Sequence, residues 1–582
     1  MKKTLLFVSF LILSLFASKH ATAQVIFMVT DPAPVAATYT FTYPTSGWGF
    51  DMNTVFVHDT MIVVRDFTVA DSLGCDTANG LANAGDVAGK IAVVYRLDCE
   101  FGVKALNAQN AGAVGVIIIN NVSGAPVIPG AGGVGSQITI PAIMISDIDG
   151  ALLRPYIDAG NSLAMIGNKT GVFANDLGAF APDIVLPNSW AIPSGIATNA
   201  AAFEIPVGAW VTNYGQNSQS NVTLNATVTL GANVLYNQTS AATTINNTGD
   251  SMFIQLPTFS QSSYADGLYR LEYTISGAPD EFADDNTLIT HFWIQPDYYS
   301  KSRWDTTSLT PIRTTHYRTA DAVDEFVWCT VLDHPDASNL TAYGVSFSAT
   351  AATTSSLAGK SMEVLLYEWN DVIDTAFTFN NLDLVASEFY DYIDNTLSGV
   401  FVTTWFPTPQ QLTNTKYLTC VKTFDTDVFI GADDFIDYET SWDAYNPNPT
   451  FDDLSVFFPI NGIVAGADDW NGVGFGSTPV PSIILHTSPV IGVEENIASI
   501  TSLPYPNPGS NYIYIPLNTV YNGKVIVNIY DLTGRTVKSE VVNMNNTNNF
   551  RVGTTNLTSG IYQFSLKFSD NSVVNFPVMI NR

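Results

Sequence analysis

Hydrophobic and polar residues follow different periods along this chain of 582 residues. Residues 91–95 and 114–119 are almost wholly apolar, which is typical of strands buried on both faces. Between them, residues 101–111 place small and apolar side chains on one side of a helix and polar ones on another. Gly112 follows at the position where a helix commonly ends. The pattern therefore predicts a strand, helix, strand unit whose two strands are parallel.

Alternation of apolar and polar residues dominates the rest of the chain. Around residues 203–215, 222–230 and 267–275 it predicts short strands with one buried face, and hence a β-sandwich over residues 180–296. Further strand-like runs at 343–349, 362–369 and 399–406 predict a second, jelly-roll-like sandwich over residues 298–488. The expected fold class is therefore multidomain and mainly β, with one α/β unit near the start.

Composition fits folded domains outside the cell. Hydrophobic residues make up 46% of the chain, enough for several cores, and only 13% of residues are charged. Acidic residues outnumber basic ones by 53 to 23, which gives a formal net charge of −30. Such a surface repels phosphate, so we expect no nucleic-acid binding.

The first residues have the form of a signal peptide. Two lysines precede an apolar run from Leu5 to Phe16, and Ala21-Thr22-Ala23 provides small residues for cleavage. The run is shorter than the roughly 20 residues that span a membrane. We predict that residues 1–23 are removed by cleavage between Ala23 and Gln24, and that the mature chain has no transmembrane segment.

Specific residues accompany the α/β unit, and they resemble the protease-associated (PA) domain family. The matching residues are Gly89-Lys-Ile-Ala92, Arg96, Cys99, Phe101, Lys104-Ala-Leu-Asn-Ala-Gln109, Ala111-Gly-Ala-Val-Gly-Val-Ile-Ile-Ile-Asn-Asn121, and Ile140-Pro-Ala-Ile-Met-Ile-Ser146 with Gly150. The chain departs from the family at Leu97-Asp98, where a glycine is common. The resemblance implies a PA domain over residues 24–170, which is a binding or positioning module without catalytic residues of its own.

Four cysteines can form disulfides once the chain is exported. The PA resemblance implies a bond between Cys75 and Cys99, because many secreted PA domains are cross-linked there. Cys329 and Cys420 each lie in a strand-like run. They either pair across neighbouring strands or remain two buried thiols.

Short motifs in the first sandwich resemble a known bacterial module. Val211-Thr-Asn-Tyr-Gly215, Gly267-Leu-Tyr269 and Asp285-Asn-Thr287 occur in that order between residues 180 and 296. They resemble the immunoglobulin-like CARDB type of module, which implies an Ig-like sandwich.

After a linker at residues 489–502, the tail carries three motifs in order: Pro506-Asn507-Pro508, Gly534-Arg535, and Gly560 with Tyr562. They resemble the type A C-terminal sorting domain of the type IX secretion system of Bacteroidota, over residues 503–582. The resemblance implies a small C-terminal β-sandwich, the type IX secretion machinery as a partner, and passage through the periplasm to the cell surface or the medium. The tail has six basic and three acidic residues, a net charge of +3 against −33 for the rest.

Familiar catalytic and metal-binding motifs are missing from the sequence. The sequences His-Glu-x-x-His, Gly-x-Ser-x-Gly and Gly-Thr-Ser do not occur. Acidic pairs at Asp284-Asp285, Asp433-Asp434 and Asp468-Asp469 offer oxygen ligands for calcium, but none completes an EF-hand loop. We interpret them as solvated turns. No cofactor is expected, with calcium as the only candidate.

These observations favour an exported, non-catalytic protein of the cell surface or the medium. Its PA domain and sandwiches are expected to bind a protein or glycan ligand. The alternative is a secreted peptidase or glycan hydrolase with an active site within residues 298–488, where carboxylates are plentiful.

Overall fold

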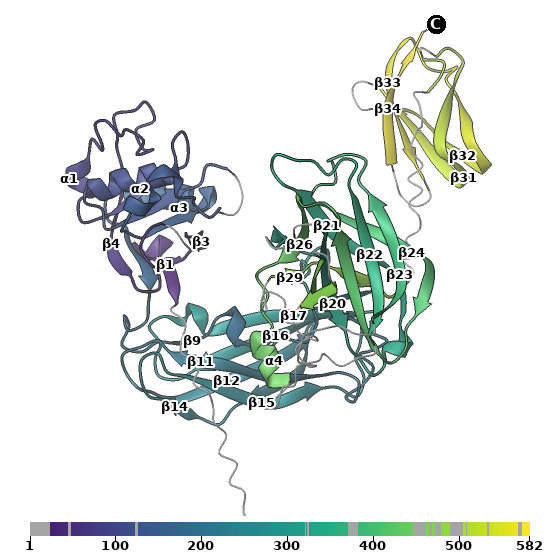
Figure 1. Ribbon diagram of the computed structural model, residues 1–582. Coiled ribbons are helices and arrows are strands. Elements are labelled where there is room, and N and C mark those ends of the chain that lie inside the picture. Colours follow the sequence, from purple (N-terminus) through teal and green to yellow (C-terminus); the bar gives the residue numbers. More distant parts are fainter. Residues whose placement is uncertain are drawn as a thin grey trace, which may run out of the picture. The chain divides into compact units, whose positions relative to one another are not determined.

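The structure, a computed structural model, describes most of the chain after residue 23 (Figure 1). The last part of the chain folds as a compact unit of its own. The described residues are 24–44, 48–122, 126–319, 322, 325–369, 382–445, 460–464, 468–471, 479–488, 504–507, 509–531, 535–568 and 573–581.

The first domain is an α/β layer on an eight-stranded sheet of order β2-β1-β8-β4-β5-β6-β7-β3. Its elements are β1 (Val25–Asp31), η1 (Ala33–Val35), β2 (Ala37–Thr38), β3 (Phe41–Thr42), β4 (Phe56–Val63), α1 (Ala84–Val87), β5 (Ile91–Tyr95), α2 (Phe101–Asn110), β6 (Gly115–Ile119), η2 (Gly132–Gln137), β7 (Ala142–Ile145), α3 (Asp147–Asp158) and β8 (Leu163–Asn168). The predicted strand, helix, strand unit is confirmed as β5, α2 and β6, with β5 and β6 parallel. Gly112 ends the helix at a φ of +88°, a conformation that favours glycine.

Two hydrophobic cores cover the two faces of this sheet. On one face, Ile91 and Val93 of β5 pack in the same cluster as Leu153 of α3. On the other face, Ala92 and Val94 cluster with small residues of α2. Strands β5 to β7 are apolar at every position because both of their faces are covered.

The second module contains two facing groups of strands. Its elements are β9 (Leu177–Gly178), η3 (Ala181–Asp183), β10 (Ala191–Pro193), β11 (Glu204–Asn213), β12 (Gln219–Leu230), β13 (Asn233–Thr239), β14 (Thr243–Ile245), β15 (Ser251–Ser260), β16 (Gly267–Ser276), η4 (Ala283–Asp285) and β17 (Thr287–Gln295). One sheet has the order β15-β11-β9, and the other contains β13-β12-β16-β17. Alternate residues of β12 and β16 are buried, and Val228 faces Leu271 across the pair. The predicted alternation is therefore confirmed.

The third module carries the remaining strands before the tail. Its elements are β18 (Tyr298–Ser300), β19 (Thr315–Tyr317), β20 (Glu325–Leu332), η5 (Ala337–Asn339), β21 (Thr341–Ala351), β22 (Ser361–Trp369), β23 (Leu382–Asp391), β24 (Phe401–Gln411), β25 (Lys416–Thr423), β26 (Val428–Asp433), α4 (Glu439–Tyr445), β27 (Ile460–Val464), β28 (Asp468–Asn471), β29 (Val480–Pro481) and β30 (Ile484–His486). One sheet has the order β23-β22-β25-β20-β27-β28. The multidomain, mainly β fold class is confirmed.

Strand β10 joins the second and third modules into one sheet. It pairs in parallel with β17 and antiparallel with β18, so the sheet runs on as β17-β10-β18-β30-β21-β26-β19. The predicted boundary between residues 296 and 298 thus lies within a continuous sheet. This continuity brings residues from both modules to one place, where the candidate site lies.

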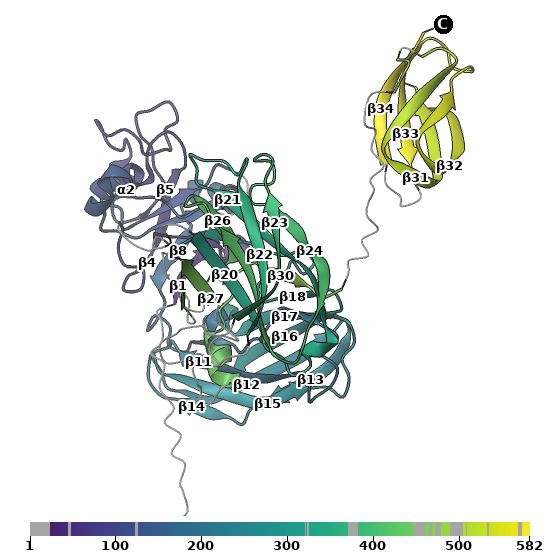
Figure 2. The same ribbon diagram turned by 45° about the vertical axis from the view of Figure 1, so that its right-hand side comes forward.

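The C-terminal unit is a four-stranded antiparallel sheet of order β32-β31-β33-β34 (Figure 2). Its strands are β31 (Tyr512–Tyr530), β32 (Thr536–Gly553), β33 (Gly560–Lys567) and β34 (Val573–Ile580). The two halves of β31 contribute to one core, because Ile513 and Val527 belong to the same cluster as Phe564 and Phe576. The register of β31 on β32 shifts between Pro516 and Tyr521.

Candidate functional site

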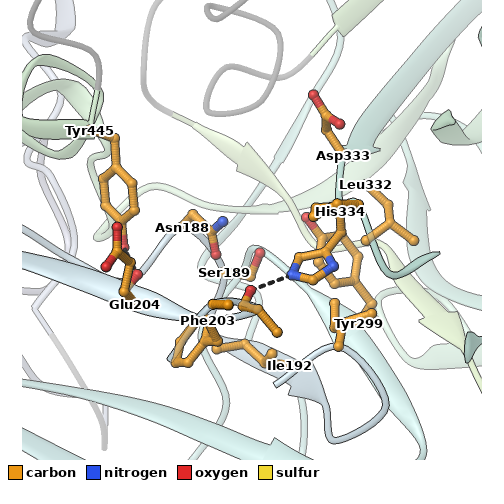
Figure 3. Close-up of a pocket in the computed structure, with 14 residues that line it drawn as sticks. Asn188, Ser189, Ile192, Phe203, Glu204, Tyr299, Leu332, Asp333, His334 and Tyr445 are labelled. Atoms are coloured by element: carbon orange, nitrogen blue, oxygen red, sulfur yellow. Dashed lines mark hydrogen bonds between the residues drawn. The ribbon is translucent and has the colours of Figure 1, made fainter. Parts of the chain in front are cut away.

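A pocket of about 260 Å³ lies where the second and third modules share their sheet (Figure 3). Its walls come from the residues around β10, the start of β11, the strand β18, the end of β20 and the helix α4. The lining residues are Asn188, Ser189, Ile192, Ile196, Ala201, Ala202, Phe203, Glu204, Tyr299, Leu332, Asp333, His334, Pro335 and Tyr445.

His334 is held on both ring nitrogens by the main chain. Nδ1 accepts a hydrogen bond from the Asp336 N–H at 3.0 Å, so Nε2 carries the proton and donates it to the Ala202 carbonyl at 2.6 Å. Burial lowers the pKa of His334, and the hydrogen bond to Ala202 and the nearby carboxylates oppose this shift without reversing it. The imidazole is therefore neutral, and both of its ring nitrogens are hydrogen-bonded. It links the turn at Ala202 to the segment that follows β20.

Two hydroxyl groups line the inner part of the pocket. Tyr299 is buried, and its hydroxyl donates to the Val331 carbonyl at 2.7 Å. Ser189 is only 1% exposed and lies near the Tyr299 hydroxyl, but its Oγ makes no hydrogen bond of normal geometry to a described residue. A buried hydroxyl in this state can donate to and accept from a bound group.

Two carboxylates lie on different sides of the pocket. Figure 3 shows Glu204 beside Tyr445 and Asp333 beside His334. Glu204 opens β11 and is exposed, whereas the Asp333 carboxylate lies 3.9 Å from Lys416 Nζ. Close by, the buried Lys301 ammonium donates to the Asn188 carbonyl at 3.0 Å. Burial lowers the pKa of Lys301 to about 7, and Asp333 acts in the opposite direction.

Both cysteine pairs form disulfides. Cys75 and Cys99 are bonded, as the family resemblance implied, and Lys104 Nζ lies 3.2 Å from Cys75 Sγ. Cys329 and Cys420 lie directly opposite each other on β20 and β25 and are also bonded. The sequence left open a disulfide across neighbouring strands or two buried thiols, and the structure contains the disulfide.

The sorting motifs have structural roles in the C-terminal unit. The Asn507 side chain accepts a hydrogen bond from the Met579 N–H at 2.9 Å, and Tyr562 is buried in the core with its hydroxyl donating to the Thr558 carbonyl at 3.0 Å. Arg535 pairs with Asp531 at 3.0 Å, and Gly560 begins β33. Pro506 is described, whereas Pro508, Gly534 and Ala23 lie outside the described residues.

The interpretation of the acidic pairs as solvated turns is wrong for two of their members. Asp285 is buried and pairs with Lys169 at 2.9 Å, and Asp433 is buried and pairs with Arg303 at 2.7 Å. Their basic partners lie far away in the sequence, so a local pattern could not identify them. The side chains of Asp468 and Asp469 lie outside the described residues, and calcium binding stays a prediction.

The sequence identified none of the pocket residues as functional. His334 is packed against the main chain of Ala202 and Asp336. The signal that could have drawn attention to the site is the adjacent pair of titratable residues Asp333 and His334, but a single such pair is common in loops. No helix in the described part of the chain is both long and apolar enough to cross a membrane.

Comparison with known families identifies two parts of the chain. Residues 60–153 match the family model described as "PA domain", and residues 504–579 match the one described as "Secretion system C-terminal sorting domain". The chain carries a PA domain and a type IX sorting domain. The sorting domain implies export and attachment at the cell surface, with the type IX secretion machinery as a partner.

Three similar proteins each match a part of the chain. A probable leucine aminopeptidase 2 of Aspergillus fumigatus is 31% identical over 120 residues, which cover 20% of this chain and 23% of that protein. The chain therefore spans about a quarter of the length of that curated relative. An aminopeptidase from Aneurinibacillus sp. strain AM-1 is 22% identical, with 25% of this chain and 31% of that chain covered and a TM-score of 0.19. A CARDB domain from Pyrococcus furiosus is 11% identical, with 21% and 94% covered and a TM-score of 0.15.

Proposed function

We propose that this exported protein is a non-catalytic binding protein of the cell surface, and that the pocket beside His334 accepts a polar group of a protein or glycan ligand. The observation that carries the proposal is the bonding of His334. Both ring nitrogens are used by main-chain groups, so the only imidazole in the pocket has neither a free base nor a free metal ligand.

The remaining lining suits recognition of a small polar group. Ile192, Leu332 and Phe203 provide apolar walls, and the buried Ser189 hydroxyl, near that of Tyr299, supplies a polar group. Ligand sites commonly combine such walls with a few fixed polar groups. At about 260 Å³ the pocket holds one such group rather than a long polymer segment. The PA domain supplies a second docking module, since its family resemblance implies positioning and not catalysis.

The alternative function, a hydrolase, is favoured by one observation. Glu204 and Asp333 both line the pocket, and paired carboxylates are the usual catalytic groups of glycoside hydrolysis. However, the acid of such a pair needs an apolar surrounding that raises its pKa. Glu204 is exposed, and Asp333 lies 3.9 Å from an ammonium group, so neither environment fits that role.

Occlusion of the pocket tests the proposed binding site. Ala201 lines the pocket and is exposed, so Ala201→Trp should fill the opening without disturbing the fold. Ala200 is also exposed but does not line the pocket, which makes Ala200→Trp the matched control. The mature chain, residues 24–582, is applied to a printed array of glycans and peptides.

We expect some array spots to bind both the wild type and Ala200→Trp. On the same spots the signal of Ala201→Trp should be at least tenfold lower than that of the wild type. Equal retention by all three proteins on every bound spot would refute the pocket as the ligand site. Thermal unfolding of the three proteins, measured in parallel, shows whether the tryptophans leave the fold intact.

A further inference from the structure

A buried cluster of charges lies where the PA domain meets the second module. Lys169 follows β8, and its side chain and that of Asp176 are fully buried, while that of Asp285 is 7% exposed. Lys169 Nζ bonds to Asp176 Oδ1 and lies 2.9 Å from Asp285 Oδ2. The rings of Phe282 and Tyr214 cover the same ammonium, with centroids at 4.2 and 4.7 Å.

This cluster contains two carboxyl groups but only one ammonium group. Two carboxylates share one ammonium, and the nearby Asp280 carboxylate is already used by the N–H groups of Leu177 and Phe282 and by the Asn286 amide. Burial raises the pKa of Asp176 to about 7 and also raises that of Asp285, because Lys169 does not offset their desolvation.

One oxygen of the cluster has no donor among the described residues. It is Oδ2 of Asp176, whose side chain is fully buried. An unpaired carboxylate oxygen at such depth is costly, and it marks a place where a further donor fits.

Gln24 lies directly beside this cluster. Strands β1 and β8 pair antiparallel with Val25 opposite Asn168, and the Lys169 N–H continues the ladder by donating to the Gln24 carbonyl at 3.0 Å. The Gln24 side chain also donates a hydrogen bond to the Asp285 carboxylate. Its amide oxygen, Oε1, accepts no hydrogen bond from a described residue. Gln24 therefore lies opposite Lys169, the residue that carries the buried ammonium group.

The predicted signal cleavage changes the charge at this position. Hydrolysis of the peptide bond between Ala23 and Gln24 adds one water: its oxygen departs with Ala23 in a carboxylate, and both of its protons end on the Gln24 nitrogen, which becomes an α-ammonium group. An amide N–H that is neutral in the precursor thus becomes a cation with three donors.

We propose that the Lys169–Asp176–Asp285 cluster is a binding site for the chain's own mature N-terminus. The α-ammonium of Gln24 donates to the unpartnered Asp176 oxygen and adds a second cation beside the two carboxyl groups. Removal of the signal peptide then completes the junction between the PA domain and the second module. The inference rests on cleavage at Gln24 and is independent of the ligand pocket.

The α-amino pKa tests this site directly. Residues 24–582 are released from a fusion that leaves Gln24 as the first residue, and the control begins one residue earlier, at Ala23. In the first protein the carboxylates should raise the α-amino pKa at least one unit above its ordinary value of about 7.7–8.0, which slows acylation at pH 8 by a factor of about five or more. The Ala23 protein should react at the ordinary rate and unfold at a lower temperature.

Variants separate this pairing from a general effect of the fold. Asp285→Asn should restore ordinary reactivity at Gln24, whereas Asp284→Asn should not, because Asp284 is exposed and bonds to Thr38 at 2.6 Å. Equal amine reactivity and equal unfolding temperatures in the Gln24 and Ala23 proteins would overturn the proposal. So would mass spectrometry of the exported protein that found Gln24 internal, or cyclised to the uncharged pyroglutamyl form.

Discussion

Two buried lysines in adjoining regions are stabilised by different kinds of partner. Lys104, on α2 of the PA domain, is fully buried and donates to the carbonyls of Leu73 and Leu97 at 3.0 and 2.7 Å. Lys169, at the end of the same domain, is equally buried, but its partners are the carboxylates of Asp176 and Asp285.

This difference decides which group has its pKa shifted by burial. Carbonyl dipoles compensate an ammonium only in part, so desolvation lowers the pKa of Lys104 to about 8, against the weaker pull of Asp98 and Asp66. At the second lysine two carboxylates compete for one cation, and desolvation raises the pKa of Asp176 to about 7 instead. The two regions should therefore respond oppositely to pH and unequally to loss of the lysine.

The largest expected effect comes from Lys169→Met. This change leaves two buried carboxylates without their cation, and removal of one partner of a buried ion pair costs about 3–5 kcal/mol of the free energy of unfolding. Adding Asp176→Asn and Asp285→Asn should recover most of the loss, because no uncompensated charge then remains. Calorimetry of residues 24–582 measures both.

Lys90→Met is the matched control for that experiment. Lys90 pairs with Asp59 at 2.8 Å, but both side chains are about a third exposed, so the loss should be about 0–1 kcal/mol. If Lys169→Met were no more destabilising than Lys90→Met, the buried cluster would not be a source of stability.

A smaller effect should appear in the pH dependence. From about pH 8 to 10.5 the unfolded chain holds a proton at Lys104 that the folded protein has released, so wild-type stability relative to Lys104→Met should rise with pH. From about pH 3.8 to 7 the folded protein holds a proton at Asp176 that the unfolded chain has lost, so stability relative to Asp176→Asn should fall as pH rises.

Each slope is at most about 1.4 kcal/mol per pH unit, and denaturant unfolding at several pH values measures it. The Asp176 comparison uses a chain with an N-terminal tag ahead of Gln24, because a terminal ammonium would lower that pKa. Slopes of the same sign at both sites would contradict the difference drawn between them.

Much of the fold could be predicted because its determinants are local. The apolar runs and the helical period around residues 91–119 gave β5, α2 and β6 to within one residue at each end. Alternation similarly located β12, β16 and β22. The motifs of the PA and sorting domains were recognisable because they are contiguous and occur in order.

The pocket could not be predicted because it depends on contacts between distant segments. It requires β10, a strand of three residues, to join two modules into one sheet, and so short a strand has no readable period. Lys104 is a charged residue of the amphipathic helix α2, yet it is buried, because residues far from the helix in the sequence cover it. The burial of Asp285 and Asp433 has the same cause.

The chemical fate of a bound ligand tests the central claim most directly. A glycan or peptide retained on the array is incubated with an excess of the mature protein, with and without added zinc or calcium, and its mass is then measured. The account predicts that the ligand is recovered unchanged in mass. A shorter product that forms with the wild type, and is lost with Glu204→Gln or Asp333→Asn, would contradict it and establish a hydrolase.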